Sequence, residues 1–333
     1  MSKRGFLGKV VISAVFIIIL LFAIEAVQRY RHPDIIFHRE YNSLGFRGKE
    51  FSVKKNQGIK RMLFIGASTT YGFFNSSEHS FSYLTEQILN SRLTSVKVEA
   101  INAARPGKDS SWVADRIEKS LFLQPDLIIV LVGYNDSSTV YGEYIKQKGE
   151  ARFSLRKPWY LKLNSFLEQH SVLYITLKEK AAILFYGDPE FAYEKGKGIG
   201  NKNKEPKGRP EWFQIYPQFY RTNIEKMIRT ARQHKIGIIF LNPPLSSSRS
   251  VEYPLYLKAF LRLKQELLSA TSKYSIPVIE LQGLFLTAEE KQDFMADGIH
   301  FSDKGNLKIA EEITGFLLKN KRKYLGTVPL ARQ

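Results

Sequence analysis

The chain has 333 residues, a formal net charge of +18 and no cysteine. With 44% hydrophobic residues it can fold into one large domain or two small ones, which excludes a wholly disordered chain. The absence of cysteine excludes disulfide bonds, thiolate metal ligands and a cysteine nucleophile. The basic excess comes without a zinc-ligand pattern, an RNP-like strand or an isolated basic helix, so we expect no nucleic-acid partner.

An uncharged apolar segment at residues 10–24 follows the basic N-terminus. Extended to Val27, it has the ~17–25 residues that a bilayer-spanning helix needs. Glu25 fits poorly with the small residues of a signal-peptide cleavage site, and a buried core helix at the extreme terminus is the less favoured alternative. We therefore expect residues 1–30 to form a cytoplasmic tip and an uncleaved transmembrane anchor, with the main domain outside the cytoplasm. The basic residues that follow leave a weak charge bias across the segment and favour an anionic membrane surface as partner.

Short apolar runs alternate with amphipathic segments after a connecting segment at 31–59. Five runs predict strands, at residues 61–66, 96–102, 125–133, 236–242 and 276–281. Apolar residues at helical spacing predict helices at residues 81–93, 110–122, 216–234, 256–271 and 304–318. This alternation predicts an α/β fold, a three-layer α/β/α sandwich with a five-stranded parallel sheet. Ligands of such sheets bind at the carboxyl ends of the strands.

The alternation stops between about residues 137 and 214, which is too long for a loop inside a compact domain. We interpret this stretch as an insertion into a main domain at 60–320, which a tail at 321–333 follows. Helical spacing recurs at 161–185, and the insertion holds many aromatic residues, namely Trp159, Tyr160, Phe166, Tyr174, Phe185, Tyr186, Trp212 and Phe213. The insertion is either a helical subdomain with its own small core, or a cap over a site or a lipid-facing surface.

Candidate functional residues follow four of the five predicted strands. Ser68 follows the first, Gly107 the second and Asn135 the third, while Asp297 and His300 lie in the loop after the fifth. Because the carboxyl ends of parallel strands lie at one edge of the sheet, these residues are expected to converge there.

These residue types suit acyl transfer through a serine nucleophile. A serine hydroxyl needs a base and a third group that orients the base, and Ser68, His300 and Asp297 supply the three types. The oxyanion that forms needs hydrogen-bond donors, which the Ser68 and Gly107 N–H groups and the Asn135 amide could provide. A glycine at 107 would let the backbone approach the substrate closely.

Each residue alone has a simpler explanation. Ser68 could cap the following helix, and Asn135 with Asp136 could form a turn. His300 could be a satisfied loop histidine and Asp297 a cap. Asp, Asn and His could also bind a metal, although no compact cluster supports one. We favour the catalytic interpretation because the simpler explanations would all have to hold together, in the same strand order.

The segments that carry these residues resemble a known family. GAS-TTYG, NAARPG, GYND and DGIH are similar to the four sequence blocks of the SGNH hydrolases, also called GDSL-like lipases and esterases. The resemblance covers about residues 60–318 apart from the insertion, and it implies a flavodoxin-like sheet. Ala67 and Ala104 depart from the family pattern, which has aspartate and glycine there. The upstream NSLGFRGKEF (42–51) looks similar to a segment that precedes this domain in membrane-anchored members.

The resemblance also implies a role for each site residue. Ser68 would be the nucleophile and one oxyanion donor, Gly107 and Asn135 the other donors, His300 the base and Asp297 its partner. Because the aspartate that Ala67 replaces is not one of these acting groups, we expect activity to survive the change.

We therefore predict a membrane-anchored serine ester hydrolase that works through an acyl-enzyme and needs no metal or organic cofactor. Its substrate would be a lipid or an O-acylated cell-surface glycan. The same residues could instead pass the acyl group to a sugar hydroxyl, an outcome that water exclusion by the insertion would favour. The alternative from another class is a non-catalytic, membrane-tethered binding domain, but none of the five site positions is lost here.

Overall fold

The computed structural model describes residues 3–31, 41–94, 96–146, 167, 171, 173–174, 177, 211–286, 290–295 and 297–326. The chain divides into two compact units. One comprises residues 1–39 and 152–198, and the other residues 40–151 and 199–333. The helix expected at 161–185, and most of the aromatic residues of the insertion, lie outside the described residues.

The first unit contains one long helix, α1 (Lys3–Arg31), which includes the apolar segment 10–24. The Glu25 carboxylate on this helix accepts hydrogen bonds from the Ser171 hydroxyl and the Leu173 N–H, each at 2.9 Å. In the part of the chain that the structure describes, no helix combines the length and the apolar character that crossing a bilayer requires. The helix is therefore present where we expected it, but the predicted transmembrane anchor is not supported.

The second unit is built on a parallel sheet with the strand order β2-β1-β3-β4-β5. Its strands are β1 (Ile59–Gly66), β2 (Lys97–Asn102), β3 (Leu127–Leu131), β4 (Gly237–Asn242) and β5 (Val278–Glu280). This order is that of a flavodoxin-like sheet, and it confirms the predicted α/β class. The central strands β1 and β3 are buried along nearly their whole length, which explains their continuous apolar runs.

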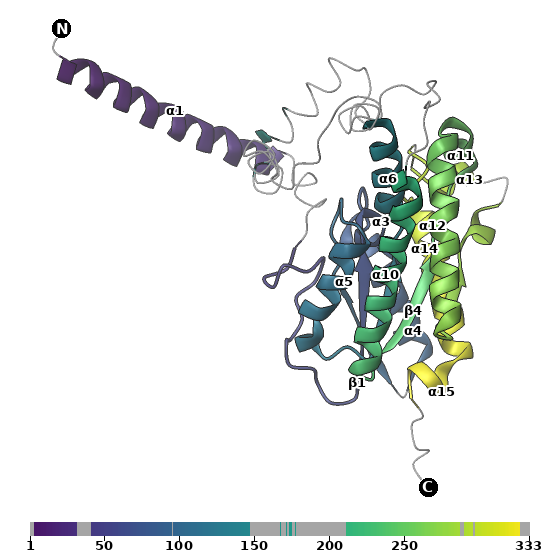
Figure 1. Cartoon of the computed structure of the whole chain (residues 1–333). Helices are drawn as coiled ribbons and strands as arrows, with labels where there is room; N and C mark the ends of the chain where they lie inside the picture. Colours follow the sequence, from purple (N-terminus) through teal and green to yellow (C-terminus); the bar gives the residue numbers. More distant parts are fainter. Residues whose placement is uncertain are drawn as a thin grey trace. The chain divides into compact units, whose positions relative to one another are not determined.

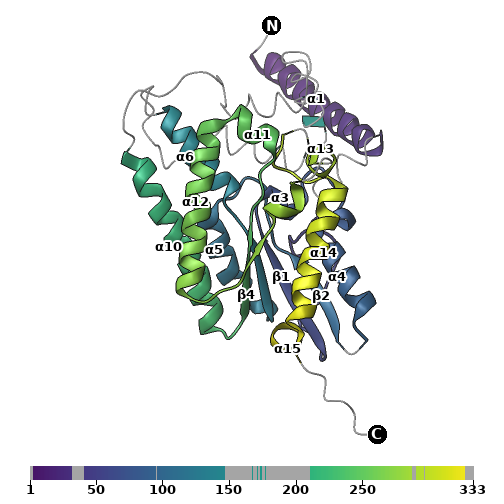
Figure 2. The ribbon, with the colours of Figure 1, turned by 90° about the vertical axis from the view of Figure 1, so that its right-hand side faces the viewer.

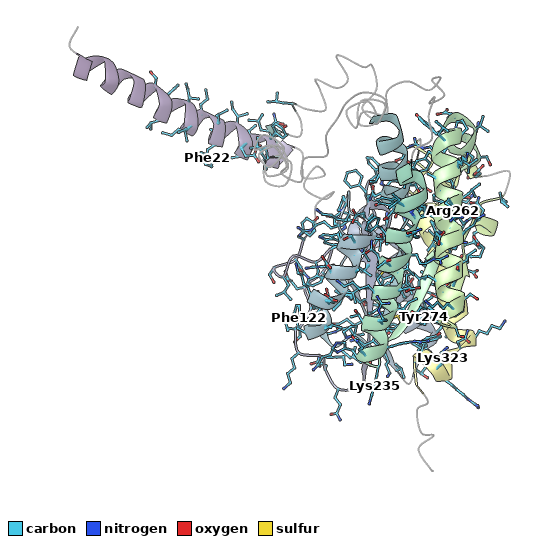
Figure 3. All side chains as sticks on the ribbon, in the orientation of Figure 1. Phe22, Phe122, Lys235, Arg262, Tyr274 and Lys323 are labelled. Atoms are coloured by element: carbon cyan, nitrogen blue, oxygen red, sulfur yellow. The ribbon has the colours of Figure 1, made fainter. Side chains whose placement is uncertain are left out.

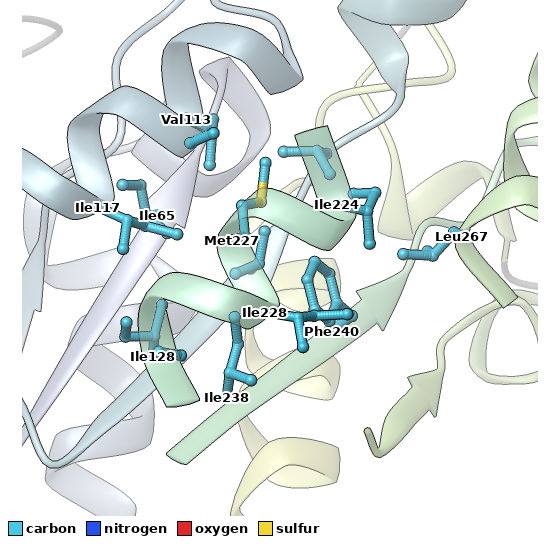
Figure 4. Close-up of a cluster of buried hydrophobic side chains, with 14 of the residues drawn as sticks. Ile65, Val113, Ile117, Ile128, Ile224, Met227, Ile228, Ile238, Phe240 and Leu267 are labelled. Carbon is cyan, nitrogen blue, oxygen red and sulfur yellow. The ribbon is translucent and has the colours of Figure 1, made fainter. Parts of the chain in front are cut away.

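Helices cover both faces of this sheet (Figures 1 and 2). One face carries α5 (Ser110–Lys119), α10 (Glu211–Gln233) and α12 (Pro254–Lys273), and the other carries α4 (Phe81–Arg92) and α14 (Asp303–Lys319). Figure 4 shows the core of the first face, where side chains of β1, β3 and β4 meet those of α5, α10 and α12. Among them are Ile65, Ile128, Phe240, Ile117, Met227 and Leu267.

Several short elements were not expected from the sequence. The longest is α6 (Tyr134–Lys146), which begins in the GYND segment, just before the predicted start of the insertion at about residue 137. The other short α-helices are α3 (Ser68–Tyr71), α11 (Ser247–Glu252), α13 (Glu290–Asp293) and α15 (Lys321–Tyr324). The 3-10 helices are η1 (Ser77–His79), η2 (Leu121–Leu123) and η3 (Gln282–Phe285).

The last residue of β1, Gly66, lies where two other elements come very close. A Cβ atom at this position would collide with the Leu131 carbonyl oxygen of β3 and with the Thr70 hydroxyl of α3. Only glycine therefore lets the strand turn directly into α3 while β3 stays paired beside it. This contact explains why the apolar run of β1 ends in a glycine.

The amino ends of the strands border a hollow of about 560 Å³. Its lining includes Lys60, Asp126 and Gly237, next to the starts of β1, β3 and β4, together with Lys235 and Lys323. The last two lysines lie at the same end of the domain in Figure 3. This hollow is therefore at the edge opposite the carboxyl ends of the strands, away from the candidate functional residues.

Replacing Gly66 by alanine is expected to lower the free energy of unfolding by ~2 kcal/mol, because the added methyl group has no room between β3 and α3. Urea titration followed by circular dichroism measures this change. Gly315→Ala is the matched control, because Gly315 lies on α14 and an added Cβ there meets nothing within 4 Å. It should stabilise the protein by ~0.5–1 kcal/mol. Equal effects of the two changes would contradict the proposed role of Gly66.

Candidate active site

Ser68 is the first residue of α3 and lies two residues beyond the end of β1. The turn closes on itself, since the Phe73 N–H donates to the Ser68 carbonyl at 3.0 Å. Gly72 ends the helix in the left-handed conformation, with φ of 76°. Ser68 therefore lies at the carboxyl edge of the sheet, where the sequence placed it.

A polar side chain at the end of the edge strand holds this turn. Asn102, the last residue of β2, donates its side-chain amide to the Thr70 carbonyl at 2.8 Å and to the Ser82 hydroxyl at 2.9 Å. Asn102 is buried, so these bonds are shielded from water. It therefore fastens α3 to β2 and α4. The sequence assigns no role to Asn102, the first residue of the NAARPG segment.

Asp297 and His300 are paired in the loop before α14. The His300 Nδ1 atom hydrogen-bonds the Asp297 Oδ2 atom, while Asp297 Oδ1 accepts the Ile299 and His300 N–H groups at 3.0 Å each. Burial by itself would raise the pKa of Asp297, but the hydrogen bonds and charge of His300 outweigh it and lower the pKa to about 2. The carboxylate is therefore ionised at neutral pH, and it orients the imidazole through Nδ1.

The other ring nitrogen of His300 faces a different environment. Its Nε2 atom is buried, and among the described residues it has no hydrogen-bond partner, so a bond to the Ser68 hydroxyl is not formed here. The ring packs against Phe73 and Phe74, with centroid separations of 5.7 and 5.2 Å. These two residues directly follow the Ser68 turn. The candidate base thus lies beside the segment that carries the candidate nucleophile, with Nε2 left to accept a proton.

Gly107, in the loop before α5, and Asn135, at the start of α6, lie in neighbouring segments at the same edge. Gly107 has a φ of +73°, a conformation that favours glycine. Asn135, in the first turn of α6, donates its side-chain Nδ2 to the Lys108 carbonyl at 2.8 Å. An amide NH₂ group has two hydrogens, so this bond orients the group and leaves the second hydrogen for another acceptor. The structure therefore brings together the two loops that were predicted to supply oxyanion donors.

A buried carboxylate links these two loops. Asp136 accepts the Ser110 N–H at 3.1 and 3.2 Å and the Ser110 hydroxyl at 2.6 Å. Asn223 on α10 donates to the same hydroxyl at 3.0 Å. Burial raises the pKa of Asp136 to about 6, although the Ser110 hydrogen bonds oppose the rise. Asp136 thus ties α6, which carries Asn135, to the start of α5, which lies three residues after Gly107. The sequence pointed to Asp136 only because this residue follows Asn135.

The start of α6 is also held by contacts with a later part of the chain. The Tyr134 hydroxyl donates to the Pro244 carbonyl, and the Tyr256 hydroxyl donates to the Tyr134 carbonyl at 3.2 Å. The Tyr134 ring stacks on Phe260 with centroids 5.6 Å apart. These contacts join residues more than a hundred positions apart, and no local sequence pattern predicted them.

The sheet order places the chain among α/β proteins with a flavodoxin-like sheet. The serine turn, the Asp–His pair and the segments with Gly107 and Asn135 all lie at the carboxyl edge of this sheet. Residues 64–308 match the model of the GDSL-like lipase/acylhydrolase family. This match spans more than half of the chain, and the chain belongs to that family, whose members are also called SGNH hydrolases. The predicted family is thereby confirmed.

Solved structures with a similar fold share little sequence with this chain. LAE5, an α/β hydrolase enzyme from the metagenome of Lake Arreo, Spain, is 14% identical, with a TM-score of 0.50 over 79% of this chain and 95% of that chain. The lipase/acylhydrolase from Enterococcus faecalis is 19% identical, with a TM-score of 0.48 over 78% of this chain and 96% of that chain. No curated protein matches the sequence. These likenesses concern the fold alone.

The raised pKa of Asp136 predicts an unusual dependence of stability on pH. A carboxyl group whose pKa rises from 3.8 to about 6 on folding stabilises the folded state below pH 4, and this contribution is lost as the pH rises through 6. The full effect is ~3 kcal/mol. The free energy of unfolding of the wild type, minus that of Asp136→Asn, should therefore fall between pH 4 and pH 7. A difference that stays constant over this range would show that Asp136 does not titrate there.

Proposed function

We propose that this protein is a serine ester hydrolase that works through a Ser68–His300–Asp297 triad. The observation that carries the proposal is the Asp297–His300 pair, whose buried Nε2 atom has no partner among the described residues and whose ring packs against the segment that follows Ser68. An imidazole held through Nδ1, with Nε2 left to accept a proton, is the arrangement that general-base activation of a serine needs. Membership in the lipase/acylhydrolase family supports the same chemistry.

The reaction proceeds in two stages. The Ser68 Oγ atom attacks the ester carbonyl while His300 Nε2 takes the hydroxyl proton, and Asp297 stabilises the imidazolium that forms. The oxyanion accepts hydrogen bonds from the Ser68 and Gly107 N–H groups and from the free hydrogen of the Asn135 amide. The tetrahedral intermediate expels the alcohol, which receives the proton from His300, and leaves an acyl-serine.

Water then attacks the acyl-serine, and His300 takes a proton from this water. Collapse of the second intermediate releases the carboxylic acid and returns the proton to Ser68.

We propose that the substrate is a lipid or an O-acylated cell-surface glycan, and that the protein acts outside the cytoplasm. If a sugar hydroxyl replaces water in the second stage, the enzyme transfers the acyl group instead of hydrolysing the ester. Product analysis with and without an acceptor glycan distinguishes the two outcomes.

Hydrolysis of p-nitrophenyl acetate and butyrate tests the proposed function. Ser68→Ala should lower kcat by ~10⁴–10⁶-fold, because the nucleophile is removed. Asn135→Ala should lower it by ~10²–10³-fold, because one oxyanion donor is lost. Ser91→Ala is the control, since Ser91 lies exposed on α4, away from the site, and its loss should leave kcat unchanged. Undiminished hydrolysis by Ser68→Ala would exclude Ser68 as the nucleophile.

A further inference from the structure

The upstream segment 41–51 precedes the part of the chain that the family model matches, yet it packs against the candidate site. Its backbone joins the edge strand through an antiparallel bridge, in which the Arg47 N–H donates to the Asn102 carbonyl at 3.0 Å. Asn42 shapes the segment by accepting the Leu44 and Phe46 N–H groups at 3.1 and 2.9 Å. The segment is therefore a defined part of the fold.

Arg47 extends from this segment into the interior, where its side chain contacts both ends of one short stretch. Its Nη1 atom donates to the Tyr71 hydroxyl at 3.2 Å, and its Nη2 atom donates to the Asn75 carbonyl at 2.7 Å. The guanidinium carbon also lies 4.3 Å from the centre of the Tyr71 ring. Arg47 is buried, so these charge-assisted bonds form away from water. The residues from Tyr71 to Asn75 are held between two fixed points.

This stretch connects the candidate nucleophile to the candidate base. Tyr71 is the last residue of α3, whose first residue is Ser68. Phe73 and Phe74, inside the stretch, contact the His300 ring.

Asn75, at the far end of the stretch, is tied to the helix that follows His300. Its side-chain amide donates to Asp303 at 2.7 Å, and its side-chain oxygen accepts from Asn306 at 3.2 Å. Both partners lie on α14. A shift of Asn75 would therefore move the stretch against the loop that carries His300.

We propose that Arg47 is a positioning residue for the catalytic centre, one that sets the placement of Ser68 relative to His300 by clamping residues 71–75. The role rests on the proposed function, because it concerns the geometry of that same reaction. It also gives a purpose to the NSLGFRGKEF segment, which the catalytic residues leave unexplained. Arg47 acts through its hydrogen bonds to Tyr71 and Asn75.

The chemistry of the clamp requires arginine. A planar guanidinium can donate two hydrogen bonds in fixed directions while it lies over an aromatic ring, whereas lysine offers a single flexible point charge. Burial raises the pKa of the Tyr71 hydroxyl well above its usual value, although the Arg47 charge opposes the rise, so the hydroxyl stays a neutral partner. Arg47→Lys therefore keeps the charge and loses the geometry.

The chain offers a matched control in Arg61. Its side chain is also buried, and it donates to the Glu99 carboxylate at 2.6 Å, to the Leu123 carbonyl at 2.6 Å and to the Ser52 carbonyl at 2.7 Å. Arg61 lies near the start of β1, at the edge opposite the candidate site. Its loss should cost stability as much as the loss of Arg47 does, without reaching the catalytic centre.

The test measures kcat and KM for p-nitrophenyl butyrate, together with the melting temperature, in full-length Arg47→Met, Arg47→Lys, Arg61→Met and wild type. Assays are run well below the lowest melting temperature. Arg47→Met should lower kcat by ~10–100-fold with KM changed by less than about threefold, because a small misplacement of reacting groups acts on the chemical step. On a logarithmic scale, the kcat of Arg47→Lys should lie closer to that of Arg47→Met than to that of the wild type. Arg61→Met should keep kcat within about twofold of wild type.

The outcomes separate this proposal from the function on which it rests. If the wild type hydrolyses the ester and Arg47→Met keeps its kcat, the positioning role is wrong and the proposed function stands. The role is also wrong if Arg47→Met and Arg61→Met lower kcat equally at equal loss of melting temperature. If Arg47→Met does not fold, kcat and the melting temperature of Arg47→Lys are compared with those of Arg61→Met in its place. A folded wild type without any ester hydrolysis refutes the proposed function itself.

Discussion

A parallel sheet places the carboxyl ends of all its strands at one edge, and the rest of this structure depends on that constraint. β1, β2 and β3 are separated in sequence by whole helices, yet Ser68, Gly107 and Asn135 all follow their carboxyl ends at this edge. The central pair, β1 and β3, come so close where β1 ends that only a glycine at position 66 fits beside Leu131. Because the two strands come so close, the chain turns tightly after Gly66. This turn places Ser68 at the edge of the sheet.

Buried polar groups then fix the loops that the sheet brings together. Asn102, Asp136 and Arg47 each make several hydrogen bonds in the interior, and two of the three carry an ionisable group. Burying such groups is costly unless they are hydrogen-bonded, so each favours the loop arrangement that supplies its partners. The candidate site therefore lies on loops that are fastened to one another as well as to the strands. Oxyanion stabilisation requires hydrogen-bond donors whose positions are fixed in advance in this way.

Much of the fold could be predicted from the sequence, because strands buried on both faces have continuous apolar runs. All five strands were placed within a few residues of their observed positions. The helix α6 was missed because its first turn, in the GYND segment, contains residues that are equally typical of turns. The apolar run at 10–24 predicted a helix correctly, but the inference from a helix to a membrane span is not supported.

The candidate site divides in the same way. Ser68 could be proposed because it lies two residues beyond β1, and Asp297 and His300 because they stand three residues apart in the loop before α14, where local pattern is informative. The role of Arg47 could not, because its partners Tyr71 and Asn75 lie 24 and 28 positions away and only the folded chain brings them together. The hydrogen bond between Tyr134 and Pro244 joins positions 110 apart, and it was beyond reach for the same reason.

The central claim is that Ser68 is chemically activated by His300. The most direct measurement is reaction of the full-length protein with a fluorophosphonate probe, followed by mass spectrometry of the labelled peptide. Such a probe forms a covalent bond with an activated serine without the need to know the natural substrate. The account predicts a single adduct on Ser68, formed much more slowly in His300→Ala. An adduct on another residue, or no adduct on the well-folded protein, would contradict it.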